Sequence, residues 1–322
     1  MTEPKPSRHR EADLSRLKTF KMADLSRKVE LGDFAGVTTA GISFAEFVRS
    51  LPGILTARDL KEFAGLLAHA ARNRKAVVAM IGGHVVKTGM APLLINWMER
   101  GILTALATHG ATIIHDTEIA LFGRTSEDVA EGLADGSFGM SRDTAEFING
   151  AISKPEHCQL GFGEALGKSL VEANAPFADK SLLCASHCTG TPLTVHVALG
   201  TDIIHQHPSA DGEAIGRASL RDFRIFADQV GRLDEGGAVI NFGSAVIMPE
   251  VFLKALTVAR NLGAPAHRFA AANFDMYQHY RPTQNVLLRP TLTGGRRFNF
   301  IGHHEIMIPL LFALVNEKLA EA

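Results

Sequence analysis

The sequence predicts an α/β fold in which a mostly parallel central sheet is flanked by helices. Short continuous apolar runs, such as AVVAMIG at 76–82, are typical of strands that are buried on both faces. Helical segments of 10–15 residues separate these runs, as right-handed βαβ units require. A chain of 322 residues with 46% hydrophobic residues can form one large globular body around such a sheet.

The predicted elements follow an N-terminal arm. Residues 1–40 are mostly polar and include Pro4 and Pro6, so we expect an extended arm followed by a single domain over 41–322. The second helix should begin at a Thr56 cap and bury residues 60, 63, 64, 67 and 71. Helices are expected at 44–55, 56–74, 91–101, 125–136, 219–233 and 248–263, and strands at 76–82, 102–110, 192–199, 238–243 and 268–275.

The composition argues against several classes of partner. Acidic and basic residues nearly balance, at 34 and 33, and they are interspersed, so no electrostatic footprint for nucleic acid or an anionic membrane is present. No apolar run approaches the roughly 20 residues of a spanning helix, and no signal peptide is recognisable. Three cysteines cannot form a disulfide framework, which fits a reducing compartment. We therefore expect a cytoplasmic protein that acts on a small molecule.

Small and polar residues gather at the predicted strand ends, where parallel sheets bind their ligands. Glycine lets the backbone approach a phosphate, and Ser or Thr at a helix start can donate to an anion. A carboxylate such as Asp202 can accept a hydrogen bond from a ribose hydroxyl. The residues predicted to bind a cofactor in this way are His84, Thr88, Gly89, Thr108, Gly110, Asp202, Gly243 and Ser244.

Familiar nucleotide motifs do not account for these residues. GFGEALG at 161–167 resembles G-x-G-x-x-G, but it is one residue too long and lacks a preceding strand. We interpret its glycines as helix-packing residues. The P-loop pattern is missing, and no serine lies in a nucleophile elbow.

Histidines and one lysine offer further chemistry. His205 and His207 are expected to alternate on a strand, and His303 and His304 are adjacent, so these four could bind a metal. Alternatively, one of them could transfer a proton, because a histidine in a crevice titrates near neutrality. Lys87 could form an imine if burial lowered its pKa, or it could pair with a phosphate or remain solvated.

The chain resembles the deoxyhypusine synthase family from about residue 75 to the C-terminus. The resemblance rests on the order and spacing of several segments, none of which is diagnostic alone. They are KTGMAPLLINWMERGILTALATHGA (87–111), TPLTVHVALGTDIIHQHP (191–208), GGAVINFGSAV (236–246), ANFDMYQHYRPTQNVLL (272–288) and HHEIMIPLLFALV (303–315).

The resemblance implies a Rossmann-like, NAD-binding fold and a homotetramer with active sites between subunits. That family transfers hydride from the polyamine spermidine to NAD and passes an aminobutyl group through a lysine imine. By position, the cofactor or amine pocket would include His84, Thr88, Gly89, Thr108, Gly110, Asp116, Asp202, Gly243, Ser244 and Asp275.

One departure from the family changes the expected chemistry. The family lysine falls close to Arg289, and no lysine occurs between Lys254 and Lys318. Arginine stays protonated and cannot form the imine. We therefore expect an NAD-dependent enzyme acting on a small amine, a polyamine or an amino acid, but not a true deoxyhypusine synthase.

The expected roles are as follows. The base would be His205 or His207. The substrate would be positioned by Asp116, Glu118 or Asp275. An anionic group would be held by Lys87, Arg281 or Arg289. Two alternatives remain open: a non-catalytic dinucleotide-binding protein, and a metal-dependent hydrolase that uses the four histidines.

Overall fold

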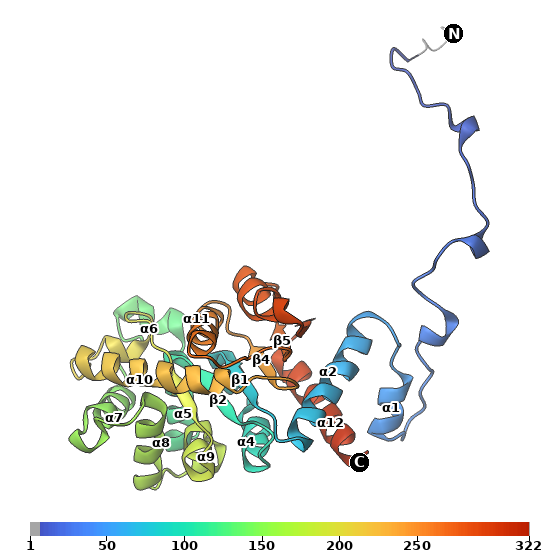
Figure 1. The fold of residues 1–322 in the computed structure, drawn as a ribbon. Helices are drawn as coiled ribbons and strands as arrows, with labels where there is room; N and C mark the ends of the chain where they lie inside the picture. The colour runs from blue at the N-terminus through green and yellow to red at the C-terminus, as the bar shows by residue number, and fades with distance from the viewer. Residues whose placement is uncertain (1–6, 322) are drawn as a thin grey trace.

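A computed structural model describes residues 7–321 and confirms the predicted fold class: a six-stranded, wholly parallel sheet is flanked by helices (Figure 1). The strand order is β3-β2-β1-β4-β5-β6. The register places Val78 beside Ala105 on β2 and beside Val239 on β4. The strands are β1 (Val77–Ile81), β2 (Ala105–Thr108), β3 (Leu193–Val195), β4 (Ala238–Phe242), β5 (Ala270–Asp275) and β6 (Arg296–Ile301).

The helices connect the strands and cover both faces of the sheet. The α-helices are α1 (Phe44–Ser50), α2 (Leu55–Arg72), α3 (Gly83–Lys87), α4 (Ala91–Glu99), α5 (Gly110–Phe122), α6 (Val129–Asp135), α7 (Arg142–Ser153), α8 (Phe162–Glu172), α9 (Leu182–Thr189), α10 (Gly212–Gly231), α11 (Ile247–Asn261) and α12 (His304–Ala320). Short 3-10 helices include η1 (Leu14–Arg16), η2 (Met22–Asp24), η3 (Leu31–Asp33) and η6 (Ile203–His205), and η7 (Pro282–Leu288) is a π-helix. Within residues 7–321, no helix combines the length and apolarity needed to cross a membrane.

Two apolar clusters lie on either side of the sheet. On one face, α10, α11 and η7 pack against alternate residues of the central strands, including Val78 and Val239. On the other face, α2, α4, α5 and α12 pack against the remaining residues, including Val77 and Ile240. All residues of β1, β2, β4 and β5 are buried, so these strands are mostly apolar and do not alternate, with polar residues such as Asn241 and Asp275 only toward their carboxyl ends.

Helix α2 shows how the apolar spacing determines packing. Leu60, Phe63, Ala64 and Leu67 are buried as the periodicity predicts, and the Phe63 ring lies 5.3 Å from that of Phe298 on β6. Truncating such a fully buried phenylalanine costs about 3–5 kcal/mol. The predicted Thr56 cap is wrong, because the helix begins one residue earlier and its N-cap, Ile54, makes no side-chain bond.

Several elements differ from those expected from the sequence. The segment GATIIHDTEIALF is helix α5, so Asp116 and Glu118 lie on a helix and not at a strand end. The expected strand containing His205 and His207 is also wrong, because Ile203–His205 forms the 3-10 helix η6. β6 was not predicted, since an edge strand with exposed arginines lacks the continuous apolar run of the central strands.

The N-terminal segment 7–40 is extended and exposed. It leaves the body beside α1 and runs away from it (Figure 1). Its base is held by two backbone bonds, from Gly36 N to Ser50 O at 2.8 Å and from Gly53 N to Asp33 O at 3.0 Å. The direction in which the arm leaves the body is therefore fixed by the turn between α1 and α2.

Candidate active site

The strand order reverses between β1 and β4. The chain proceeds outward from β1 to β2 and β3, and then returns to place β4 against the other edge of β1. In parallel sheets, ligands bind beside the carboxyl ends of the strands at such a reversal, because the connections that follow the two strands leave in opposite directions. We call the residues at this point, Gly82, His84, Gly243, Asp275 and His304, the switch-point crevice.

Glycines allow close contacts in the switch-point crevice. A Cβ atom on Gly82 would lie 2.6 Å from the carbonyl oxygen of Gly243. A Cβ atom on Gly243 would overlap Nε2 of His304, and Gly243 has a φ of 68°, which favours glycine. The imidazole of His304 therefore lies directly against the backbone at the end of β4.

Two buried polar atoms at this point have no hydrogen-bond partner within the described chain: Nδ1 of His304 and Oδ2 of Asp275. Nε2 of His279 lies 3.9 Å from the same Asp275 oxygen, beyond hydrogen-bond distance. The backbone bond from Gly302 N to Asp275 O, at 3.0 Å, joins the end of β5 to the start of α12. Burial lowers the pKa of His304, and the nearby Asp275 carboxylate opposes that shift. Because a buried polar group without a partner costs about 1–3 kcal/mol, these two atoms mark a place where a ligand could bind.

A second polar region lies beside α5, where two cavities of about 350 and 240 Å³ share Glu118, Ser126 and Glu127. We call them together the α5 cavity. Four carboxylates line it, from Glu118, Glu127, Asp143 and Asp202, together with the basic side chains of Lys87 and Arg124. The structure thus brings together Lys87, Glu118 and Asp202, which the strand-end analysis had selected separately.

Hydrogen bonds orient the carboxylate of Glu118. Its two oxygens accept from the hydroxyls of Thr125, at 2.5 Å, and Thr144, at 3.1 Å. The Thr125 hydroxyl also lies 2.7 Å from Nδ1 of His115. Burial, followed by the charges of Lys87 and His109, lowers the pKa of His115 to about 4. His115 is therefore neutral at physiological pH.

The carboxylate of Asp202 occupies the N-terminus of α5. A Cβ atom on Gly110 would overlap this carboxylate, so the close approach requires glycine. Burial raises the pKa of Asp202 to about 6, and a hydrogen bond from the Ala111 amide opposes the shift. An anion already sits where a helix N-terminus would attract a phosphate, so the α5 terminus is filled from within the chain.

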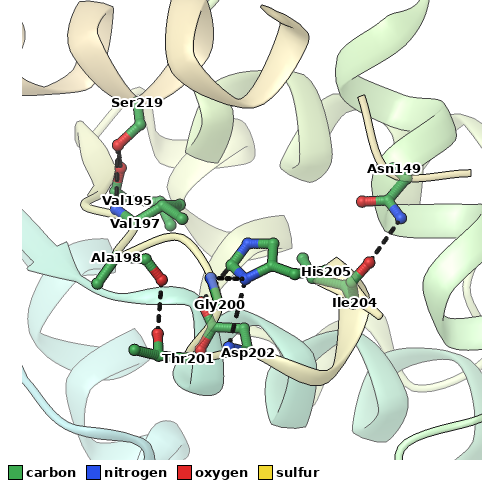
Figure 2. A network of polar contacts seen from close by, with 10 residues as sticks. All are labelled: Asn149, Val195, Val197, Ala198, Gly200, Thr201, Asp202, Ile204, His205 and Ser219. Carbon is green, nitrogen blue, oxygen red and sulfur yellow. Dashed lines mark hydrogen bonds and ion pairs between the residues drawn. The ribbon is translucent and has the colours of Figure 1, made fainter. Parts of the chain in front are cut away.

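His205 holds the loop that carries Asp202 (Figure 2). Its Nδ1 accepts hydrogen bonds from the amides of Gly200, at 3.2 Å, and Asp202, at 3.3 Å. Because Nδ1 is an acceptor, the ring is neutral with its proton on Nε2, and burial lowers its pKa. Nε2 lies 4.0 Å from Oδ2 of Asp202, beyond hydrogen-bond distance. The contacts of His205 indicate that it positions the loop.

Several other selected residues use their polar groups within the fold. The hydroxyl of Thr88 donates to His84 O at 2.9 Å, and Gly89 follows it in a left-handed turn. The Thr108 hydroxyl donates to Ile81 O, also at 2.9 Å, and so links β2 to β1. Asp116 is buried and accepts from the Ser181 hydroxyl and from the amides of Leu182 and Leu183, which caps α9.

The remaining candidates do not line the α5 cavity. Nδ1 of His207 contacts the hydroxyl and the amide of Ser209, as part of the loop before α10. Arg289 is exposed and donates to Asn285 at 2.6 Å within the π-helix η7. Ser244 accepts from the Met248 amide at 3.2 Å, at the start of α11.

The four histidines do not form a metal centre. No group of three or more His, Cys, Asp or Glu side chains within residues 7–321 is arranged to hold a metal ion. His205 is bound to the loop before η6, whereas His304 packs on Gly243. The metal-dependent alternative therefore lacks a set of ligands. The glycines of GFGEALG do pack helices as expected, because a Cβ atom on Gly167 would lie 2.5 Å from Leu183 O.

Glu127 and Asp143 line the α5 cavity but were not predicted from the ends of the strands. Both lie in the 122–146 segment, which follows α5, far from any strand. Their signal in the sequence was the density of acids in that segment, not their position after an apolar run. The sequence offered His304 as a metal ligand or as one of four candidates for proton transfer, but not as a strand-end residue, because β6 was not predicted.

No protein-family model and no curated protein matches this sequence. Solved structures do share its fold. A LOR/SDH protein from Methanococcus maripaludis S2 has a TM-score of 0.52 and 16% identity, covering 82% of this chain and 70% of that chain. AgrE in a ternary complex with ornithine and NAD+ has a TM-score of 0.50 and 12% identity, covering 83% and 34% respectively. This chain therefore spans about a third of AgrE.

A protein from Entamoeba histolytica, provisionally described as a deoxyhypusine synthase, has a TM-score of 0.50 and 11% identity. The match covers 85% of this chain and 93% of that chain. At these identities, the similarities establish a shared fold. They support the resemblance found in the sequence at the level of architecture.

Proposed function

We propose that this protein is an NAD-dependent enzyme that transfers hydride to or from a small amine or amino acid. The observation that carries the proposal is the pair of buried, unpartnered atoms, His304 Nδ1 and Asp275 Oδ2, beside the Gly82–Gly243 contact. His304 is the group we assign to proton transfer, because its depressed pKa keeps it neutral and able to accept a proton at pH 7. This assignment replaces His205 and His207.

The switch-point crevice fits a dinucleotide. The amides of Ser244, Ala245 and Val246 make no hydrogen bond within the described residues, and they precede the 15-residue helix α11. Such amides and the helix dipole favour the phosphates of a cofactor. The competing position, the N-terminus of α5, is filled by Asp202. We therefore assign the phosphates to the β4–α11 turn, with NAD supplying the hydride acceptor or donor when bound.

The α5 cavity fits the substrate. Four carboxylates outnumber the two basic side chains around it, so a cationic amine is favoured. Lys87 and Arg124 could bind the carboxylate of an amino acid while Glu118 binds an ammonium group. Polyamines and amino acids are therefore both candidates. AgrE was solved with ornithine, an amino acid that carries a second amine.

Group transfer through an imine would have to use a lysine other than one at the family position. Arg289, which falls close to that position, is exposed and bonded to Asn285. Lys87 is the lysine that lines the α5 cavity, so we assign any imine chemistry to it. We also propose a homotetramer, following the resemblance.

A titration with NAD tests the proposal, using the full chain and calorimetry. We expect binding at micromolar to millimolar NAD. We also expect reduction of NAD in the presence of one member of an amine and amino-acid panel. His304→Asn should lower kcat by about 10²–10⁴-fold, the usual contribution of a general base, whereas the exposed neighbour His303→Asn should not. Absence of binding at millimolar NAD would overturn the proposal.

Tight binding of NAD without reduction by any panel member would instead favour a non-catalytic dinucleotide-binding protein. In that case His304→Asn would alter NAD affinity without changing any rate.

A further inference from the structure

The N-terminal arm carries large apolar side chains that nothing in its own chain covers. Between residues 14 and 37 these are Leu14, Leu17, Phe20, Met22, Leu25, Val29, Leu31, Phe34 and Val37, with exposures from 42% to 100%. Soluble proteins rarely leave so much apolar surface together without a binding function. No residue of η1, η2 or η3 is buried, so the arm gains little from the body beyond the two backbone bonds at its base.

The arm nevertheless has a definite local pattern. The pentapeptide ADLSR occurs twice, at 12–16 and at 23–27, and places an exposed leucine at the same position in each copy. Asp13 accepts from the Ser15 amide at 3.0 Å and so caps η1. Glu30 and Asp33 form a capping box around η3. A repeated apolar position in a segment with its own turns is typical of a binding segment rather than of a solvated linker.

The body has an exposed surface of matching character over residues 122–146, which we call the α6 surface. No residue of α6 is buried, and Val129 and Leu133 form an exposed apolar pair one turn apart on this helix. Phe122 and Met140 are exposed at its two ends. Like the arm, this surface therefore consists of apolar groups that the same chain leaves uncovered.

The charges of the two segments are opposite. Residues 7–28 contain seven Lys and Arg side chains against three Asp and Glu, whereas the α6 surface contains six Asp and Glu against two Arg. Opposite charges on two surfaces speed their association and favour the correct partner, while apolar contacts stabilise the complex. The arm leaves the body next to α1, and α6 lies at the opposite end of the molecule in Figure 1. Contact between two copies of the chain is therefore the natural arrangement.

We propose that the arm of one copy binds the α6 surface of a second copy. The inference does not rest on the proposed enzymatic function, but the α6 surface includes Arg124, Glu127 and Asp143, which line the α5 cavity, so the arm would bind beside the proposed substrate site. Phe20 and the leucines of the two ADLSR repeats would pack against Val129 and Leu133, and the basic side chains of the arm would face the acids around α6. Because the two surfaces differ, the contact is head-to-tail unless two copies exchange arms about a twofold axis.

Photocrosslinking of the full chain tests this contact. Phe20 is replaced by p-benzoylphenylalanine, and copies grown in ¹⁴N and ¹⁵N are mixed before irradiation. We expect crosslinks between residue 20 and residues 122–146 in which one peptide is ¹⁴N-labelled and the other ¹⁵N-labelled, because such a pair must come from two copies. Leu133→Glu should reduce their yield by about tenfold or more, because it puts a charge into the apolar contact. Leu262→Glu, at a similarly exposed leucine that follows the C-terminus of α11, should leave the yield unchanged.

Raising the salt concentration from 0.05 to about 0.5 M should also reduce the yield, since exposed charges are screened. Crosslinks confined to one chain, crosslinks to another surface of the second copy, or the absence of crosslinks would each overturn the proposal. Equal yields from the Leu133→Glu and Leu262→Glu proteins would overturn it as well.

Discussion

The switch-point crevice and the α5 cavity differ in how their polar groups are satisfied. In the crevice, His304 Nδ1 and Asp275 Oδ2 are buried without a partner. In the cavity, both oxygens of Glu118 accept hydrogen bonds, and Asp202 accepts one from the Ala111 amide although its Oδ2 has no hydrogen-bond partner. The two regions therefore differ in their main polar group: the Glu118 carboxylate is fully bonded, whereas neither His304 Nδ1 nor Asp275 Oδ2 is. A ligand gains more by bonding a free buried atom than by displacing bonds already made. The comparison assigns the cofactor to the crevice and the variable substrate to the cavity.

The largest expected effect comes from filling the close contact between the ends of β1 and β4. Gly82→Ala places a Cβ 2.6 Å from the Gly243 carbonyl oxygen, so the ends of β1 and β4 must move apart. We expect a loss of about 1–3 kcal/mol in the free energy of unfolding, as for other overpacked sites, and loss of NAD binding. Chemical denaturation and NAD titration measure the two effects.

The matched control is Gly65→Ala, within α2, where an added Cβ meets nothing within 4 Å. This substitution should stabilise the protein by up to about 1 kcal/mol, because alanine is the better helix former. If Gly82→Ala were as benign as Gly65→Ala, the two strand ends would not be in the close contact described.

The second prediction concerns Asp222, a buried carboxyl group whose effect on stability depends on pH. Asp222 on α10 accepts from the amides of Val195, at 2.7 Å, and Gly163, at 3.1 Å, through the same oxygen. Burial raises its pKa to about 7, and those amides oppose the shift. The folded protein then binds this proton more tightly than the unfolded chain, so the contribution to stability is complete below about pH 4 and is lost as the pH rises toward 7.

Asp222→Asn keeps one oxygen for both amides and removes the charge. The free energy of unfolding should then decline less between pH 4 and 7, by at most about 1.4 kcal/mol per pH unit for one proton. Denaturation curves at several pH values measure the slope. Asp228→Asn, at an exposed position on the same helix, should leave it unchanged. An unaltered slope in Asp222→Asn would show that the carboxyl does not titrate in this range.

A smaller effect is expected from Lys87→Met in the α5 cavity. The Lys87 charge helps to depress the pKa of His115, so its removal should move that pKa upward from about 4, as NMR titration can show. Binding of a substrate carboxylate should weaken about two- to fivefold, the range of an exposed ion pair. NAD affinity should not change. A loss of NAD binding would mean that the cofactor occupies the cavity and that the two regions have been assigned the wrong way round.

The smallest effect is expected from Arg289→Met. This exposed side chain bonds only to Asn285, so stability should change by less than about 0.5 kcal/mol. Turnover should be unaffected, as measured under the conditions used for Lys87→Met. A large loss of activity would instead restore this position to the active site and argue for chemistry closer to that of the family the sequence resembles.

The central strands and long helices could be predicted from the sequence because their burial is regular. β1, β4 and β5 are buried along their whole length and mostly apolar, and α2 shows a clear helical period. Helix α5 was harder, since Thr112, Ile113 and Ile114 form a β-branched run that continues past β2. Because this helix was not predicted, the positions of Asp116 and Glu118 on it could not be predicted either.

The candidate site could be predicted only in part. The strand-end rule selected His84, Gly243 and Ser244, because the carboxyl ends of parallel strands share one edge of the sheet. It could not show that Asp202 fills the α5 terminus or that Thr108 is used between strands, since both depend on contacts between distant segments. Nor could it bring Glu127 and Asp143 to the cavity, because they follow a helix.

Hydrogen exchange with and without NAD tests the assignment of the two regions most directly. We expect NAD to protect the amides of residues 82–89 and 243–248, around the ends of β1 and β4, and to leave residues 123–146 unchanged. Protection confined to 123–146, or no protection anywhere at millimolar NAD, would contradict the account.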